Sequence, residues 1–222
     1  MTPIDQGTIH YRDEVVRKLI HLCSLSIPII YYYIPRSDSI IILSILAAIA
    51  IFLDLSRHFN RDFGKFFYKF FGFLLRKHEV DNNKKNFNGA TYVFISALIC
   101  AIIFPKILFI TAFSILIISD STAALIGRKF GKHKFLSKSL EGTVAFFISA
   151  CIVVMFTPKL SGIAVEYYIG IIASAVGAIV ENISFGFADD NLSIPISIGL
   201  TMWILYIIML PGVKLILPHS TF

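Results

Sequence analysis

The segment Ser119–Thr143 reads SDSTAALIGRKFGKHKFLSKSLEGT and joins two apolar runs of the chain. The run before it begins at Ile107 and carries one carboxylate, Asp120, and the run after it begins past Glu141. A charge near the centre of a bilayer costs roughly 2.5–3.5 kcal/mol, so an acid inside a membrane helix is a functional candidate. The segment therefore predicts two membrane helices joined by a basic loop, with one acid at each edge.

The basic loop suits a polyanion, because lysine and arginine contact phosphate oxygens and carboxylates hold Mg²⁺. Its five cations are Arg128, Lys129, Lys132, Lys134 and Lys138. Ser139 is placed to cap the second helix, whose N-terminus would then bind phosphate on the same side. The loop is not a Walker motif, since His133 follows Lys132 and no strand precedes it. Gly127 and Gly131 also suit close helix packing. We expect a nucleotide held with a divalent metal.

The composition is that of a polytopic membrane protein, with 222 residues of which 56% are hydrophobic and 15% charged. We expect an all-α fold and a single transmembrane domain over residues 1–222. The net charge of +6 is spread between apolar runs, so it favours anionic lipid headgroups over nucleic acid. Cys23, Cys100 and Cys151 lack metal-ligand spacing, which predicts three free thiols. The first fourteen residues show no cleavable signal pattern, so we expect the N-terminus to be retained.

Seven apolar stretches are each long enough to cross about 30 Å of hydrocarbon with modest help from flanking residues. They lie near 15–34, 39–54, 88–104, 107–126, 141–157, 162–180 and 193–210. The third is short and ends at a Pro-Lys break, so six spans are an alternative. Sixteen of the 20 Lys and Arg residues fall on the side of the N-terminus and the even-numbered loops. This imbalance predicts that side to be cytoplasmic and, with seven spans, the C-terminus to be outside.

A helix of a different kind is predicted at about 56–78. Basic residues recur there at intervals of four, while five phenylalanines and a leucine fill the opposite arc. The basic residues are Arg57, Arg61, Lys65 and Lys69. The pattern is typical of a helix lying in the membrane interface. Anchoring is the simpler interpretation, and walling the route of a lipid substrate is the other.

Polar residues also mark the expected cytoplasmic ends of three other spans. The first span carries Glu14, Arg17, Lys18 and His21 on one helical face. The third opens on Asn88 and Thr91, which suit either a helix cap or a site. The sixth ends at Glu181, before a loop without cations that includes Asp189, Asp190 and Asn191. We expect these last acids to face the cationic loop, a metal, or both.

Together these motifs resemble the CTP-dependent lipid kinases, which include dolichol kinase, phytol kinase and the CTP-using diacylglycerol kinase. The resemblance rests on Asp120-x-x-Ala-Ala-x-x-Gly-Arg-x-Phe-Gly-Lys132 and on Ser137-Lys-Ser-x-Glu-Gly-Thr143. Glu14-x-x-Arg-Lys-x-x-His21, Gly89-Ala-Thr91 and Glu181 with Asp189-Asp-Asn-Leu192 also look like that family, in the same order. The central segment alone is similar to CDP-diacylglycerol synthases. Those usually carry Ser-Pro-Lys-Lys before Thr-x-Glu-Gly, and the departure seen here favours the kinases.

The resemblance implies a membrane kinase that moves the γ-phosphoryl group of CTP to a lipid hydroxyl with Mg²⁺. The expected metal ligands are Asp120, Glu141 and Asp190. The expected catalytic residues are Asp120, Lys138 and Glu141, with His21 and Glu181 as candidate bases. The expected nucleotide-binding residues are Arg17, Lys18, Asn88, Thr91, Arg128, Lys129, Gly131, Lys132, Ser139 and Asn191.

Two rival functions stay open at this point. A cytidylyltransferase would release pyrophosphate instead of CDP, and a transporter or scaffold would consume no nucleotide. The acceptor is open between isoprenoid alcohols and diacylglycerol, and so is association into a homo-oligomer. The site is expected on the cytoplasmic side of a plasma membrane in a prokaryote, or of an endoplasmic reticulum or plastid membrane in a eukaryote.

Overall fold

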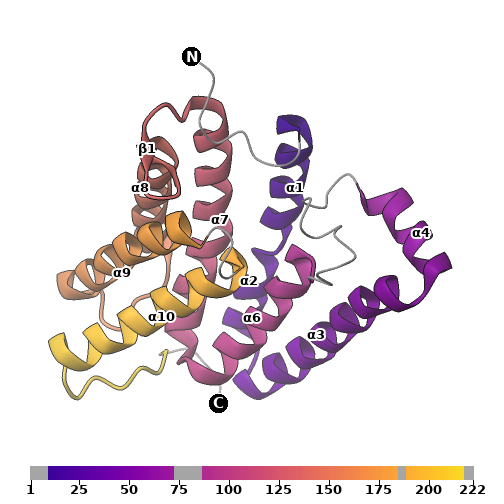
Figure 1. The fold of residues 1–222 in the computed structure, drawn as a ribbon. Coiled ribbons are helices and arrows are strands. Elements are labelled where there is room, and N and C mark those ends of the chain that lie inside the picture. The colour runs from indigo at the N-terminus through magenta and orange to yellow at the C-terminus, as the bar shows by residue number, and fades with distance from the viewer. Residues whose placement is uncertain (1–9, 73–86, 185–188, 218–222) are drawn as a thin grey trace.

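The protein is described by a computed structural model that covers residues 10–72, 87–184 and 189–217. Figure 1 shows a bundle of helices with one small hairpin. The elements are α1 (Tyr11–Cys23), α2 (Ser26–Tyr33), α3 (Arg36–Phe59), α4 (Arg61–Phe71), α6 (Gly89–Ile103), α7 (Lys106–Phe130), β1 (Lys134–Phe135), β2 (Lys138–Ser139), α8 (Leu140–Phe156), α9 (Ala164–Ile183) and α10 (Asp190–Met209).

The expected all-α membrane fold is confirmed, because all seven predicted apolar stretches are helical. Among the described residues, five helical segments are long and apolar enough to cross a membrane. They are α1 with α2, α3, α7, α9 and α10. The helices α6 and α8 are apolar but have 15 and 17 residues. At 1.5 Å per residue they reach roughly 22–26 Å, which is short of a 30 Å core.

The first predicted span, at 15–34, is two helices and not one. Pro28 has no amide hydrogen, so it cannot donate to the carbonyl of Ser24 as a continuous helix requires. The amide of Ile27 donates to that carbonyl instead, at 2.9 Å. The chain therefore turns at Ser24 and Leu25, between α1 and α2.

The helix α7 is the centre of the bundle. Its most apolar window is 83% buried, whereas the windows of the other four long segments are 17–44% buried. It packs against α8, α10, α2 and α1, as Figure 1 shows. A helix that is apolar all round is expected to be buried by protein. An acid on α7 therefore faces other side chains and not hydrocarbon.

Glycine lets the α7 end, the hairpin and α8 approach closely. A Cβ at Gly142 would lie 3.1 Å from the carbonyl oxygen of Ala123. At Gly131 it would lie 2.3 Å from the carbonyl oxygen of Gly127 and 2.7 Å from the Ser139 Cβ. Close packing therefore accounts for Gly131, which the sequence pattern had placed among the nucleotide-binding residues.

The predicted interfacial helix begins later than expected, at Arg61. Asn60 starts α4 by accepting hydrogen bonds from the amides of Asp62 and Phe63 at 3.0 and 3.1 Å. Arg57 does not belong to the predicted basic stripe: it lies in the last turn of α3, is buried, and forms an ion pair with Asp54. Residues 73–78 of the predicted helix lie outside the described residues.

Candidate active site

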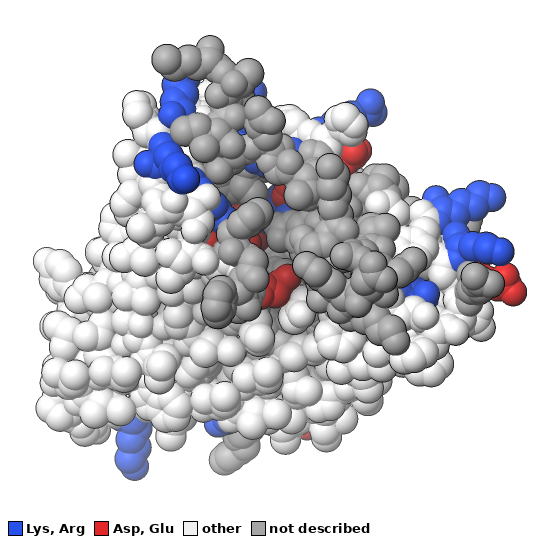
Figure 2. All heavy atoms as spheres, in the orientation of Figure 1, with Lys and Arg blue, Asp and Glu red and all other residues white. Residues whose placement is uncertain are grey.

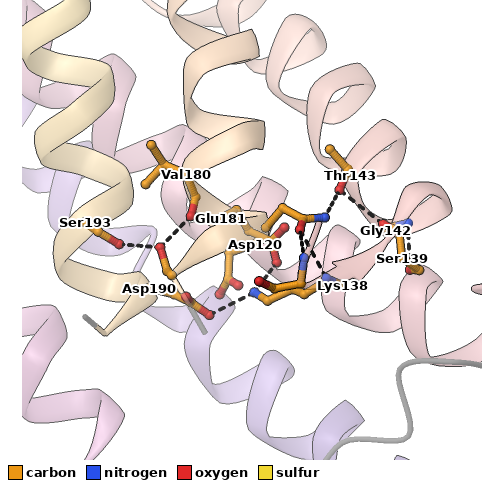
Figure 3. A network of polar contacts seen from close by, with 12 residues as sticks. Asp120, Lys138, Ser139, Gly142, Thr143, Val180, Glu181, Asp190 and Ser193 are labelled. Atoms are coloured by element: carbon orange, nitrogen blue, oxygen red, sulfur yellow. Dashed lines mark hydrogen bonds and ion pairs between the residues drawn. The ribbon is translucent and has the colours of Figure 1, made fainter. Parts of the chain in front are cut away.

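Three acids from three helices meet at one end of the bundle. They are Asp120 of α7, Glu181 near the end of α9 and Asp190 at the start of α10. One carboxylate oxygen from each lies within 4.8 Å of the others. Their side chains point toward one another (Figure 3), and all three residues are at most 7% exposed. We call them the acid cluster, and this end of the bundle the site end.

Two lysines from elsewhere in the chain compensate the acid cluster, and His21 lies beside it. Lys18 of α1 forms a buried ion pair with the Oδ2 atom of Asp120. The Nε2 atom of His21 lies 3.7 Å from the same oxygen. The Lys138 ammonium lies 2.5 Å from Glu181 Oε1 and 3.3 Å from Asp190 Oδ2. Burial alone would lower the pKa of Lys138, but the carboxylates of Asp190 and Glu181 outweigh burial and raise it. Lys138 therefore stays cationic at neutral pH.

The hairpin places Lys138, and Asn182 holds the hairpin. The Asn182 Oδ1 accepts hydrogen bonds from the amides of Ser137 and Lys138 at 2.8 and 3.1 Å. Its Nδ2 donates to Thr143 Oγ1 at 2.6 Å. Ser139 caps α8 as predicted, because its Oγ accepts from the Gly142 amide at 3.2 Å. One asparagine thus joins the ends of α9 and α8 to the strand that carries Lys138.

Helix N-termini gather at the site end. The helix α8 begins directly after β2, and α10 begins at Asp190 with Asp189 as its cap. Asn191 Nδ2 donates to Asp189 Oδ1 at 2.7 Å and to the Gly89 carbonyl of α6 at 3.5 Å. The N-terminus of a helix carries a partial positive charge and free amides, which favour bound anions. This end of the bundle is suited to phosphate groups.

A second ionic network lies between α1 and α7. The Glu14 carboxylate accepts from Arg17 at 2.5 Å and from Arg128 at 3.0 Å. Both arginines were predicted to bind the nucleotide, and the structure brings them together at Glu14.

Figure 2 shows charged side chains gathered at the upper end of the molecule, above a wide uncharged band.

Several other predicted residues are not members of the acid cluster. The structure does not bring Glu141 to Asp120, because the Glu141 carboxylate faces His133, with Oε1 2.7 Å from Nδ1. Lys129 and Lys132 are exposed. Asn88 and Thr91 form a helix cap, in which Asn88 Oδ1 accepts from the Thr91 amide at 2.9 Å. The local spacing did not reveal which way these side chains point.

Two residues at the site end were missed. Asn182 directly follows Glu181, and a polar residue beside an acid at the end of an apolar helix is a signal that could have found it. Asp54 is fully buried and accepts from the Asn88 amide at 2.7 Å. The argument applied to Asp120, that an acid in an apolar helix is costly, would have identified it.

The chemistry of the acid cluster fits a divalent cation. Three buried carboxylates supply three oxygen ligands within 4.8 Å of one another. Carboxylate oxygens are the ligands that Mg²⁺ prefers. Asp120 and Asp190 were predicted metal ligands, and the structure groups Glu181 with them in the place expected for Glu141.

Comparisons with known proteins point to lipid kinases. An uncharacterized protein of Rickettsia prowazekii is 34% identical over 186 residues, which cover 83% of this chain and 90% of the relative. The CTP-dependent diacylglycerol kinase 1 of Schizosaccharomyces pombe is 28% identical over 66% of this chain and 70% of that enzyme. The dolichol kinase of the same yeast is 37% identical over 90 residues, which are 39% of this chain and 17% of that enzyme. No family model and no solved structure matches the chain.

Proposed function

Because the chain belongs to the CTP-dependent lipid kinase family, we propose that it transfers the γ-phosphoryl group of CTP to the hydroxyl of a membrane lipid. The observation that carries the proposal is the acid cluster beside Lys138, at an end of the bundle where helix N-termini meet. Phosphoryl transfer depends mainly on positioning and on neutralising charge, which such a site supplies. The distribution of Lys and Arg supports a cytoplasmic site.

Asp120, Glu181 and Asp190 would hold Mg²⁺, since they supply three buried oxygen ligands. When bound, the ion would neutralise charge on the phosphates of CTP. Lys138 would contact phosphate oxygens as a fixed positive charge. The N-termini of α8 and α10 would orient the phosphates with backbone amides.

The lipid hydroxyl oxygen would attack the γ-phosphorus. A new O–P bond forms, the bond to the bridging oxygen breaks, and CDP leaves with the electron pair. The hydroxyl proton needs a base within the site. Of the two expected bases, His21 fits better, because the Glu181 carboxylate already accepts a hydrogen bond from the Lys138 ammonium. His21 also lies on α1 at the edge of the acid cluster, 3.7 Å from Asp120.

A panel of nucleotides and acceptors tests this function. Purified protein is incubated with CTP, ATP, GTP or UTP and Mg²⁺, each with an isoprenoid alcohol, a diacylglycerol or no acceptor. We expect CDP and a phosphorylated lipid in equal amounts, with CTP and an acceptor both required. Pyrophosphate in place of CDP would instead identify a cytidylyltransferase. Absence of any nucleotide consumption would reject the proposal.

Replacing Glu181 or Glu141 with glutamine tests which of the two acids holds the metal. Glu181→Gln removes an oxygen ligand of the acid cluster, whereas Glu141→Gln removes an acid that faces His133. We expect Glu181→Gln to raise the Mg²⁺ concentration for half-maximal activity at least about tenfold, and Glu141→Gln by less than about twofold. Binding of Mn²⁺, followed by electron paramagnetic resonance without CTP, gives the same comparison without turnover. The reverse order would restore Glu141 as the ligand.

A further inference from the structure

A buried ion pair that is not part of the acid cluster lies at the end of α3. Asp54 is 0% exposed and Arg57 is 3% exposed, and their side chains pair across one helical turn. Replacing a buried ion pair with apolar side chains of similar volume often leaves a protein at least as stable. Such a pair is therefore a weak source of stability, and its contacts with other elements are the better guide to its role.

Arg57 joins α3 to α4. Its guanidinium carbon lies 5.4 Å from the centre of the Phe67 ring and 6.0 Å from that of Tyr68. The two backbones are also close, because a Cβ at Gly64 would lie 2.8 Å from the Arg57 carbonyl oxygen. A cation is attracted by the face of an aromatic ring, most strongly where water is excluded. Arg57 is thus held between Asp54 and the aromatic side chains of α4.

Asp54 joins α3 to α6. Its Oδ1 atom pairs with Arg57, and its Oδ2 atom accepts a hydrogen bond from the Asn88 amide at 2.7 Å. Asn88 is the residue that caps α6, so this hydrogen bond fixes the start of that helix. The two oxygens of one carboxylate therefore tie the first turn of α6 to the ion pair.

The first turn of α6 in turn contacts the start of α10. The helix α6 packs against both α3 and α10, as Figure 1 shows. The Gly89 carbonyl oxygen accepts from Asn191 Nδ2 at 3.5 Å, and the same nitrogen donates to Asp189 Oδ1 at 2.7 Å. Asp190, a member of the acid cluster, stands between these two residues in the chain. A shift of the first turn of α6 would therefore reach the turn that directs Asp190.

We propose that Asp54 is a positioning residue for the acid cluster. It holds the first turn of α6 against Asn191 and so keeps Asp190 directed toward the other two acids. This inference rests on the proposed function, in which the acid cluster holds Mg²⁺. Asp54 acts through the backbone of α6, and an apolar side chain of the same size could not accept the Asn88 amide.

Replacing the ion pair with apolar side chains separates positioning from folding. The double variant Asp54→Leu, Arg57→Met keeps similar volumes and introduces no unpaired charge, so we expect its Tm to stay within about 3 °C of the wild type. Loss of a group that directly supports a metal ligand weakens metal binding about 10–100-fold. Asp54 acts from further away, so we expect the Kd for Mn²⁺ to rise about fivefold. Electron paramagnetic resonance without CTP measures it. Wild-type Mn²⁺ affinity in a variant that keeps its Tm would overturn the inference.

A proline at position 88 tests the single hydrogen bond from α6. The φ angle of Asn88 is −78°, which proline can adopt, so Asn88→Pro removes the amide donor and leaves the ion pair in place. Asn88→Ala also removes the capping side chain but keeps the amide, so it is the matched control. We expect the Kd for Mn²⁺ to rise about fivefold in Asn88→Pro and less than about twofold in Asn88→Ala. Equal rises in the two variants would count against the role of Asp54.

Combining the changes tests whether they break the same link. Asn88→Pro added to the Asp54→Leu, Arg57→Met variant should cause no further rise in the Kd for Mn²⁺, because the acceptor of the amide is already gone. Fully additive rises would show that the two changes act independently and would overturn the inference.

Glu166 provides a control for a general loss of stability. It is 1% exposed and accepts from the amides of Leu160, Ser161 and Gly162 at 2.7–2.9 Å. It lies in the first turn of α9, about 22 Å along that helix from Glu181. Glu166→Gln should lower the Tm and leave the Kd for Mn²⁺ unchanged. A fivefold rise in this variant would show that metal binding follows stability alone, which contradicts a specific role for Asp54.

Metal binding and CDP formation separate the inference from the proposed function. Weaker Mn²⁺ binding by the Asp54→Leu, Arg57→Met variant of a protein that forms no CDP would reject the kinase and keep the positioning role. CDP formation with an unchanged Kd for Mn²⁺ in that variant would reject the positioning role and keep the kinase.

Discussion

Replacing Asp120 with asparagine is expected to lower CDP formation by roughly 10²–10³-fold, the loss typical of removing one group that stabilises transition-state charge. Asp120 contacts Lys18 and His21 of α1 and contributes an oxygen to the acid cluster. The amide keeps the size of the side chain but loses its charge. The measurement is CDP release at saturating CTP, Mg²⁺ and lipid alcohol.

The fold of this variant needs its own control, because Asp120→Asn leaves Lys18 buried without its charged partner. Breaking a buried ion pair costs about 3–5 kcal/mol. We therefore expect a lower Tm, and partial recovery of Tm when Lys18→Met is added, with activity still lost. Asp38→Asn, at an exposed position of α3, is the charge-matched control and should change neither Tm nor CDP formation. Wild-type activity in Asp120→Asn would remove this residue from the site.

Replacing Lys138 with methionine is expected to lower CDP formation by a similar factor of roughly 10²–10³. Its ammonium bridges Glu181 and Asp190, and in the proposed complex it contacts the phosphates. Lys138→Arg keeps the charge but changes its geometry, so we expect intermediate activity. Lys134→Met, an exposed lysine on the same hairpin, is the matched control. Equal losses at Lys134 and Lys138 would indicate a general effect of positive charge and contradict the specific site.

The raised pKa of Lys138 sets the direction of its pH dependence. Burial lowers this pKa, and the two carboxylates more than reverse the effect. Because the pKa is higher in the folded than in the unfolded state, the stabilisation is complete below the ordinary lysine value of about 10.4. It is lost only as the pH rises through the raised value. In the metal-free protein, Lys138 should therefore cause no fall in Tm between pH 7 and 9.

The amino-acid pattern predicts the helices well, because long apolar runs have few alternatives in a membrane. It also singles out Asp120, because a charged side chain in an apolar membrane helix is costly and therefore indicates a function. The contacts between helix ends could not be read in this way. Glu141 is close in sequence to Lys138, yet Glu181 lies beside it in space. The difference depends on how α9 packs against α8 and α7, which residue spacing within one helix does not encode.

Two further features of the structure follow from local chemistry that the sequence contains. The turn between α1 and α2 follows from the missing amide of Pro28. The burial of Arg57 follows from Asp54 one turn earlier, a spacing that favours an ion pair. Both features are visible in the residues themselves.

The order in which the paired charges occur along the chain has a consequence for biosynthesis. Lys18 precedes Asp120 by 102 residues, and Lys138 precedes Glu181 and Asp190 by 43 and 52. At the acid cluster, the ribosome therefore makes Lys18 and Lys138 before the acids that they neutralise. When the helix bearing Asp120 leaves the translocon, its partner is already in the bilayer, so insertion need not leave an isolated carboxylate exposed to lipid.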